Sequence, residues 1–139
     1  MIFYEGNLTA RPDELQIITT VNNGPPVTTT FLNQKTGFIM FQDSIECYQA
    51  IGNALANAAK TPWDRIAVEA TLDGVRVDVV AACWRESEPS PVAYLTGVPR
   101  LASYFYDLAR LVSTEEKGLF KKCRFTLEKS GKYDMNFDY

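Results

Sequence analysis

Residues 123–139, CRFTLEKSGKYDMNFDY, determine the fold class more than any other stretch of the chain. Apolar residues occupy alternate positions on both sides of a short polar segment, at 123, 125, 127, 133, 135, 137 and 139. This alternation is typical of two β-strands that each place one face on a core and the other in water. Between them, Lys129-Ser130-Gly131 suits a three-residue hairpin loop in which Gly131 adopts a positive φ. The stretch therefore predicts an antiparallel hairpin.

The predicted register of this hairpin also pairs opposite charges on its solvent side. Glu128 faces Lys132 near the loop, and Lys122 faces Asp138 at the far end. Opposite charges across neighbouring strands stabilise the pairing. We therefore expect the chain to end on a strand of an antiparallel sheet.

The rest of the sequence predicts further strands and two helices. Alternating or β-branched residues predict strands over 15–21, 27–32, 38–41, 66–72, 75–83 and 92–95. Asp43 and Glu46 form a capping-box-like pattern at the start of a helix that ends near Lys60, before Pro62. The apolar residue Ile45 lies on the expected buried stripe of this helix. Pro99 is expected to be the first residue of a second helix.

This order of elements predicts an α+β fold, an antiparallel sheet of hairpins with two helices packed on one face. The length of 139 residues suits a single domain over 1–139, with a β-rich N-terminal extension at 1–43 and a core at 44–139. The 46% hydrophobic and 22% charged fractions are those of a globular protein.

Composition also narrows the compartment and the partners. No apolar run approaches the roughly 20 residues that span a bilayer, and no secretory signal is recognisable at the start. The 3 cysteines are widely spaced, which favours free thiols in a reducing compartment. The net charge of −3 and the lack of a basic stripe argue against direct nucleic-acid binding. We expect a cytoplasmic protein without a membrane partner.

Several classes of chemistry are excluded or disfavoured by residue content. The chain has 0 histidines, which removes His general bases, Ser-His and Cys-His nucleophile pairs, and His-based metal sites. The glycine fingerprints of nucleotide sites and the signatures of zinc and calcium sites are missing. We therefore expect no cofactor, no metal, no catalytic residue and no enzymatic activity.

The hairpin predicted around Asp73-Gly74 contains one feature that needs an explanation. A two-residue turn there would place Glu69 opposite Asp78 on the outward side, where like charges destabilise the pairing. Neighbouring arginines, Arg65 and Arg76, a bound cation, or a basic partner protein could each compensate the repulsion.

The same outward row continues with an apolar strip. It holds Val80, Ala82 and Trp84, and tryptophan beside acidic residues is typical of an interface centre. The N-terminal strands could equally cover this row.

Two parts of the chain resemble the YezG-like immunity proteins, the antitoxins of bacterial polymorphic and contact-dependent toxin systems. The first is CYQAIGNAL…PWDRIAVEA at residues 47–70, where Tyr48, Ile51, Trp63 and Ile66 match. The second is the Phe-rich strand at 120–127 with the Gly-Lys-aromatic turn and acidic-aromatic strand at 131–139. The resemblance spans about residues 44–139 and leaves 1–43 outside it.

This resemblance implies a small cytoplasmic protein that binds and neutralises the C-terminal domain of a cognate toxin, commonly a basic nuclease. An acidic surface suits such a partner, because carboxylates can take the place of nucleic-acid phosphates. The expected contact residues are Glu69, Asp78, Trp84, Glu86 and Glu88. The alternative is a small regulatory or ligand-binding α+β module that uses the aromatic N-terminal half as a pocket.

Overall fold

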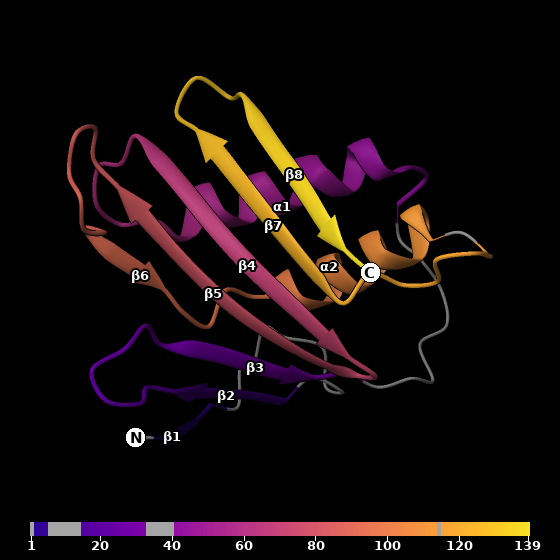
Figure 1. Cartoon of the computed structure of the whole chain (residues 1–139). Coiled ribbons are helices and arrows are strands. Elements are labelled where there is room, and N and C mark those ends of the chain that lie inside the picture. Colours follow the sequence, from indigo (N-terminus) through magenta and orange to yellow (C-terminus); the bar gives the residue numbers. More distant parts are fainter. Residues whose placement is uncertain (1, 6–14, 33–40, 114) are drawn as a thin grey trace.

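The computed structural model describes residues 2–5, 15–32, 41–113 and 115–139 of the chain (Figure 1). The strands are β1 (Ile2–Glu5), β2 (Leu15–Thr19), β3 (Val27–Phe31), β4 (Arg65–Asp73), β5 (Arg76–Trp84), β6 (Ala93–Leu95), β7 (Lys122–Glu128) and β8 (Tyr133–Asp138). The helices are α1 (Ser44–Ala58) and α2 (Leu101–Val112). The expected strand over 38–41 falls mostly outside the described residues.

All strands belong to one antiparallel sheet in the order β1-β2-β3-β5-β4-β7-β8. Three hairpins, β2–β3, β4–β5 and β7–β8, supply half of the neighbouring pairs along this order. β3 pairs with residues 76–79 of β5 and so attaches the N-terminal hairpin to the sheet. β6 pairs with residues 81–83 further along the same edge of β5. The N-terminal strands therefore extend the sheet sideways and do not cover the outward row of β5.

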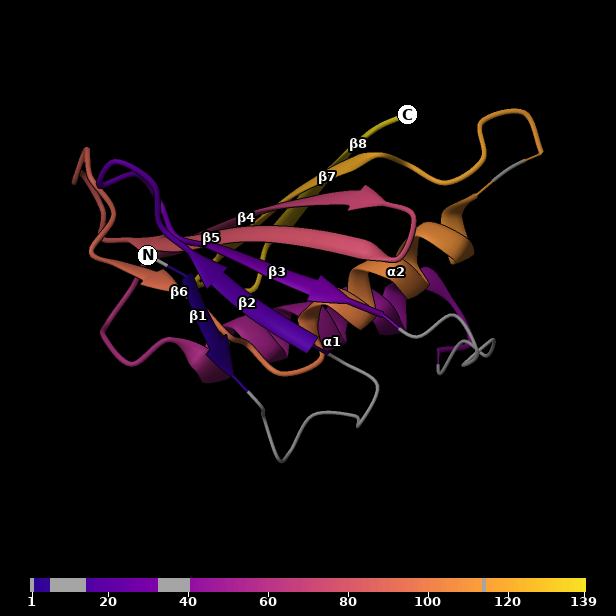
Figure 2. The ribbon, with the colours of Figure 1, turned by 90° about the horizontal axis from the view of Figure 1, so that it is seen from below.

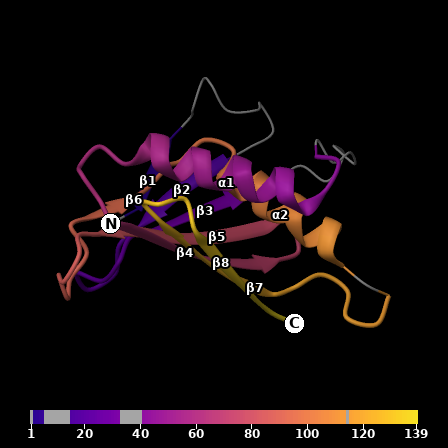
Figure 3. The ribbon, with the colours of Figure 1, turned by 90° about the horizontal axis from the view of Figure 1, so that it is seen from above.

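Both helices lie on one face of the sheet and pack against each other (Figure 2). The view from the opposite side shows α1 and α2 running across the same face (Figure 3). Alternate residues of β4, β5 and β7 point toward the helices and are buried, as their alternating pattern predicts. The largest fully buried side chains are Phe105, Phe120 and Phe125. The α+β architecture predicted from the sequence is confirmed.

The C-terminal hairpin has the predicted register. Lys122 is opposite Asp138, and Gly131 has a φ of 95° in the loop. The N–H of Gly131 donates to the carbonyl of Glu128 at 2.8 Å, and the N–H of Glu128 donates to the carbonyl of Lys132 at 2.8 Å. This loop geometry needs a residue that tolerates positive φ at its last position, which glycine supplies.

The register predicted for the β4–β5 hairpin is wrong by two residues. Asp73 pairs with Arg76, so the turn residues are Gly74 and Val75 instead of Asp73 and Gly74. Gly74 has a φ of 59°, which suits the first central position of a type II′ turn. A shift of two residues keeps every side chain on its predicted face. It nevertheless changes which residues lie opposite each other.

The two helices begin close to their predicted starts. The Asp43 carboxylate accepts a hydrogen bond from the N–H of Glu46 at 2.9 Å, and the Glu46 carboxylate accepts one from the N–H of Gln42 at 2.8 Å. The predicted burial of Ile45 is wrong, since its side chain is 57% exposed. The buried stripe of α1 consists of Cys47, Ile51 and Leu55, which leaves Ile45 on the solvent side of the helix. α2 begins at Leu101, two residues after the predicted start.

Replacing Asp43 by alanine is expected to lower the free energy of unfolding by about 1 kcal/mol, because the first turn of α1 loses its capping acceptor. Urea denaturation of both proteins measures the difference. Asp43→Ser is the matched control, since a serine hydroxyl can accept the same hydrogen bond and should preserve most of the stability. Equal losses for both substitutions would contradict the capping role.

Candidate partner-binding face

The face of the sheet opposite the helices, called the outer face below, is formed by alternate residues of β4, β5 and β7. It contains an open hollow of about 360 Å³. Its apolar lining includes Ala67, Val80, Ala82, Trp84, Pro91 and Tyr94. Ala82 lies opposite Tyr94 of β6 and is only 4% exposed, although its side chain points away from the helices. The outer face therefore carries a partly sheltered apolar floor.

Trp84 separates this hollow from a second one with polar walls. The guanidinium carbon of Arg65 lies 4.7 Å from the centre of the Trp84 ring, in a cation–π arrangement. Beyond the ring, a hollow of about 600 Å³ lies between the loop at 85–90 and the turn at 128–130. One aromatic side chain thus contributes to an apolar wall on one side and to a charged wall on the other.

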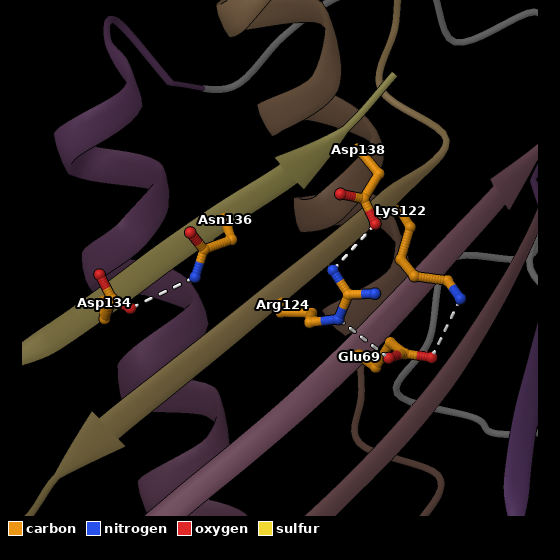
Figure 4. Close-up of polar contacts among 6 residues, drawn as sticks. All are labelled: Glu69, Lys122, Arg124, Asp134, Asn136 and Asp138. Carbon is orange, nitrogen blue, oxygen red and sulfur yellow. Dashed lines mark hydrogen bonds and ion pairs between the residues drawn. The ribbon is translucent and has the colours of Figure 1, made fainter.

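In the structure, the carboxylate of Glu69 forms ion pairs with cations other than the two arginines that were expected. Glu69 lies opposite Val80 on β5 and opposite Arg124 on β7. Its carboxylate oxygens lie 3.4 Å from the Nζ of Lys122 and 3.4 Å from the Nε of Arg124 (Figure 4). Arg124 also contacts Asp138 at 2.8 Å. Glu69 borders the apolar hollow, as part of a surface network that spans three strands.

The predicted opposition of Glu69 and Asp78 is therefore wrong, because the turn lies one residue further along the chain, which shifts the pairing by two residues. Asp78 lies opposite Thr71 and contacts the Nε of Arg76 at 3.1 Å. The hydroxyl of Thr29 donates a hydrogen bond to Asp78 at 2.6 Å. Of the two arginines considered for these carboxylates, Arg76 pairs with Asp78. Arg65 instead lies over the Trp84 ring and forms no ion pair with either carboxylate.

Glu86 and Glu88 lie in the exposed loop after β5 and line the polar hollow with Trp84. The loop is held by Asp64, whose carboxylate accepts the N–H of Glu86 at 2.7 Å and contacts Arg85 at 3.4 Å. Among the described residues, the carboxylates of Glu86 and Glu88 have no ion pair. Asp78 lies six positions before Trp84 on the same strand and borders neither hollow.

Tyr94 and Arg124 are among the lining residues that were not identified from the sequence. Tyr94 is 43% exposed on β6, and the predicted strand at 92–95 gave no sign that β6 would pair beside Ala82. Arg124 alternates outward on β7, but its closeness to Glu69 depends on the β4–β7 pairing. Pairing between strands so distant in sequence has no local signal.

The described residues contain no group of three or more cysteine, aspartate or glutamate side chains placed to hold a metal ion. Cys47, Cys83 and Cys123 are free and buried. Burial raises the pKa of the Cys123 thiol to about 12, and burial together with the nearby Asp107 raises that of Cys47 to about 12. These two thiols are protonated at neutral pH and are poor nucleophiles.

Comparisons with known proteins leave the family open: no protein-family model and no curated protein matches the sequence. In the described part of the chain, neither helix combines the length and apolarity that crossing a bilayer requires.

Proposed function

We propose that this protein is an immunity protein that binds the C-terminal domain of a cognate bacterial toxin through its outer face and blocks the toxin in the cytoplasm. The observation that carries the proposal is the apolar hollow beside Trp84, on the face that the helices leave open. An apolar surface that is bordered by an aromatic residue and surrounded by charged residues is typical of the centre of a protein–protein interface. The resemblance of residues 44–139 to immunity proteins supports the same function.

The charges beside the hollow support a basic partner. Glu86, Glu88 and Glu128 line the polar hollow beside Arg65, Arg85 and Lys129, and the described residues provide no ion pair for the three glutamates. Lysine or arginine side chains of a nuclease can supply that pairing, speed the encounter and fix the register of the complex. In this proposal the chain acts by occupying the partner's surface and performs no catalysis.

The alternative function, a ligand-binding module, has less support from the described residues. A partly open pocket beside the N-terminal strands, lined by residues that include Gln16, Thr28 and Leu95, has a volume of about 10 Å³. That volume suits a single water molecule and is too small for a metabolite.

The proposal is tested with the product of the neighbouring gene, which on this proposal is a secreted protein with a toxic C-terminal domain. Its C-terminal domain is expected to be toxic when expressed alone in the cytoplasm and harmless when this chain is co-expressed. The two purified proteins should form a complex, and the isolated chain should show no turnover. Toxicity that persists together with the absence of a complex would reject the proposal.

Trp84→Ala is expected to weaken binding of that toxin domain about 30-fold, because a central tryptophan typically contributes at least about 2 kcal/mol to an interface. Isothermal titration calorimetry measures the change. Leu119→Ala is the matched control, since Leu119 is 42% exposed and lies outside both hollows. Unchanged affinity for Trp84→Ala would place the interface elsewhere on the molecule.

A further inference from the structure

β8 ends the strand order of the sheet, and in the described ranges no strand lies beyond it (Figure 1). An edge strand presents unpaired backbone N–H and C=O groups, which are a template for another extended chain. β8 contains no proline and no lysine, two residues that commonly protect such edges. Its edge therefore has the backbone groups needed to accept a further strand.

The hydrogen bonds at the loop identify which groups of β8 are free. Glu128 and Lys132 form a hydrogen-bonded pair, and such pairs alternate along an antiparallel ladder. Residues 134, 136 and 138 consequently bond to β7, whereas Tyr133, Met135 and Phe137 direct their N–H and C=O groups to the open edge. The side chain of Tyr133 is 43% exposed there and lies 5.5 Å from Tyr48 of α1, measured between ring centres.

The exposed side chains of β8 set the charge that an added strand would meet. Asp134, Asn136 and Asp138 follow one another at every second position on the solvent side. The Asn136 amide donates to Asp134 at 3.3 Å, and Asp138 contacts Arg124 on the side of β7 (Figure 4). An adjoining strand therefore meets two carboxylates separated by four positions.

A second copy of β8 meets like charges in one register at this edge. In an antiparallel pair centred on Asn136, Asp134 of one copy lies opposite Asp138 of the other, and the same opposition occurs twice. Like charges directly opposite each other destabilise a strand pair. A pair centred on Met135 instead places Asp138 opposite Lys132, so a second copy is an outcome that the test distinguishes, while the two carboxylates favour a partner segment of opposite charge.

We propose that the edge of β8 binds an extended segment of a partner protein that carries lysine or arginine at two positions four residues apart. The segment adds a strand to the sheet through Tyr133, Met135 and Phe137 and pairs its cations with Asp134 and Asp138. None of these residues lines a hollow of the outer face, although Asp138 contacts Arg124, which lines the apolar one. The site does not depend on the function proposed above.

The test uses the full chain, labelled with ¹⁵N, and the capped peptide Val-Arg-Val-Thr-Val-Arg, which repeats the required spacing. Amide shifts and slowed hydrogen exchange are expected at Tyr133, Met135 and Phe137, with little change at Trp84 and Tyr94. Asp134→Lys should weaken binding of the peptide roughly tenfold, because one attractive cross-strand pair becomes repulsive. Asp73→Lys, the same charge change at an exposed residue of the β4–β5 turn, should leave the affinity within about twofold of the wild-type value.

Three results would overturn the proposal. The first is that the arginine peptide does not bind, and the second is that a version with glutamate in place of arginine binds equally well. The third is self-association of the wild-type chain with exchange protection at β8, measured by sedimentation and hydrogen exchange. None of these results bears on the toxin complex, which is tested with a different partner and a different face.

Discussion

The free energy of unfolding is expected to fall above about pH 9, by about 1.4 kcal/mol per pH unit for each of the buried thiols of Cys47 and Cys123. Their pKa rises from an ordinary value of 9.0 to about 12 in the folded protein. Above pH 9 the unfolded chain releases these protons while the folded chain retains them, so ionisation favours unfolding. The stabilisation is complete below pH 9 and is lost as the pH approaches 12.

Urea denaturation at a series of pH values between 8 and 10.5 measures this slope. The double variant Cys47→Ala/Cys123→Ala is the control, since it retains all other titrating groups. It should be less stable at pH 8, because each sulfur fills space in the core. Its stability should nevertheless fall less steeply with pH. Identical slopes for both proteins would show that the thiols do not cause the alkaline loss.

Arg110→Ala is expected to lower the free energy of unfolding by about 3 kcal/mol, because it leaves a buried carboxylate without its cation. Asp107 is buried on α2, and its carboxylate lies 2.7 Å from the Nη2 of Arg110, one turn further along the helix. The guanidinium carbon of Arg110 also lies 5.3 Å from the ring centre of Tyr106. Thermal and urea unfolding at pH 7 measure the loss.

A second substitution separates charge from packing in this pair. Asp107→Asn in the Arg110→Ala background removes the unpaired charge and should restore part of the lost stability. A double variant that is less stable than Arg110→Ala alone would contradict this explanation. The exposed pair of Arg76 and Asp78 is a useful comparison, since Arg76→Ala should cost less than about 1 kcal/mol.

Local patterns in the sequence predicted most of the fold. The alternation at 123–139 and the glycine at 131 gave the correct C-terminal register, because loop length and the position of positive φ specify one pairing. Around Gly74, glycine at either central position of the turn is compatible with a hairpin. The two registers place the same residues inward, so the burial pattern could not distinguish them.

The candidate site was predicted only in part, for a related reason. Glu69 and Trp84 border the same hollow, and Glu86 and Glu88 line the neighbouring one, whereas Asp78 contacts Arg76 and Thr29 and borders neither. The floor itself depends on β6 pairing with β5, and the ion network depends on β4 pairing with β7. These contacts join segments that are remote in sequence.

The strand order has a consequence for how quickly the chain can refold. Each hairpin closes a short loop, whereas the β3–β5 and β4–β7 junctions each close a segment that contains a helix. Loop-closure entropy must be overcome before such distant contacts contribute, and proteins rich in them fold in milliseconds to seconds. The hairpins should therefore nucleate early, and the joining of β4 to β7 should limit the rate at which the sheet is completed.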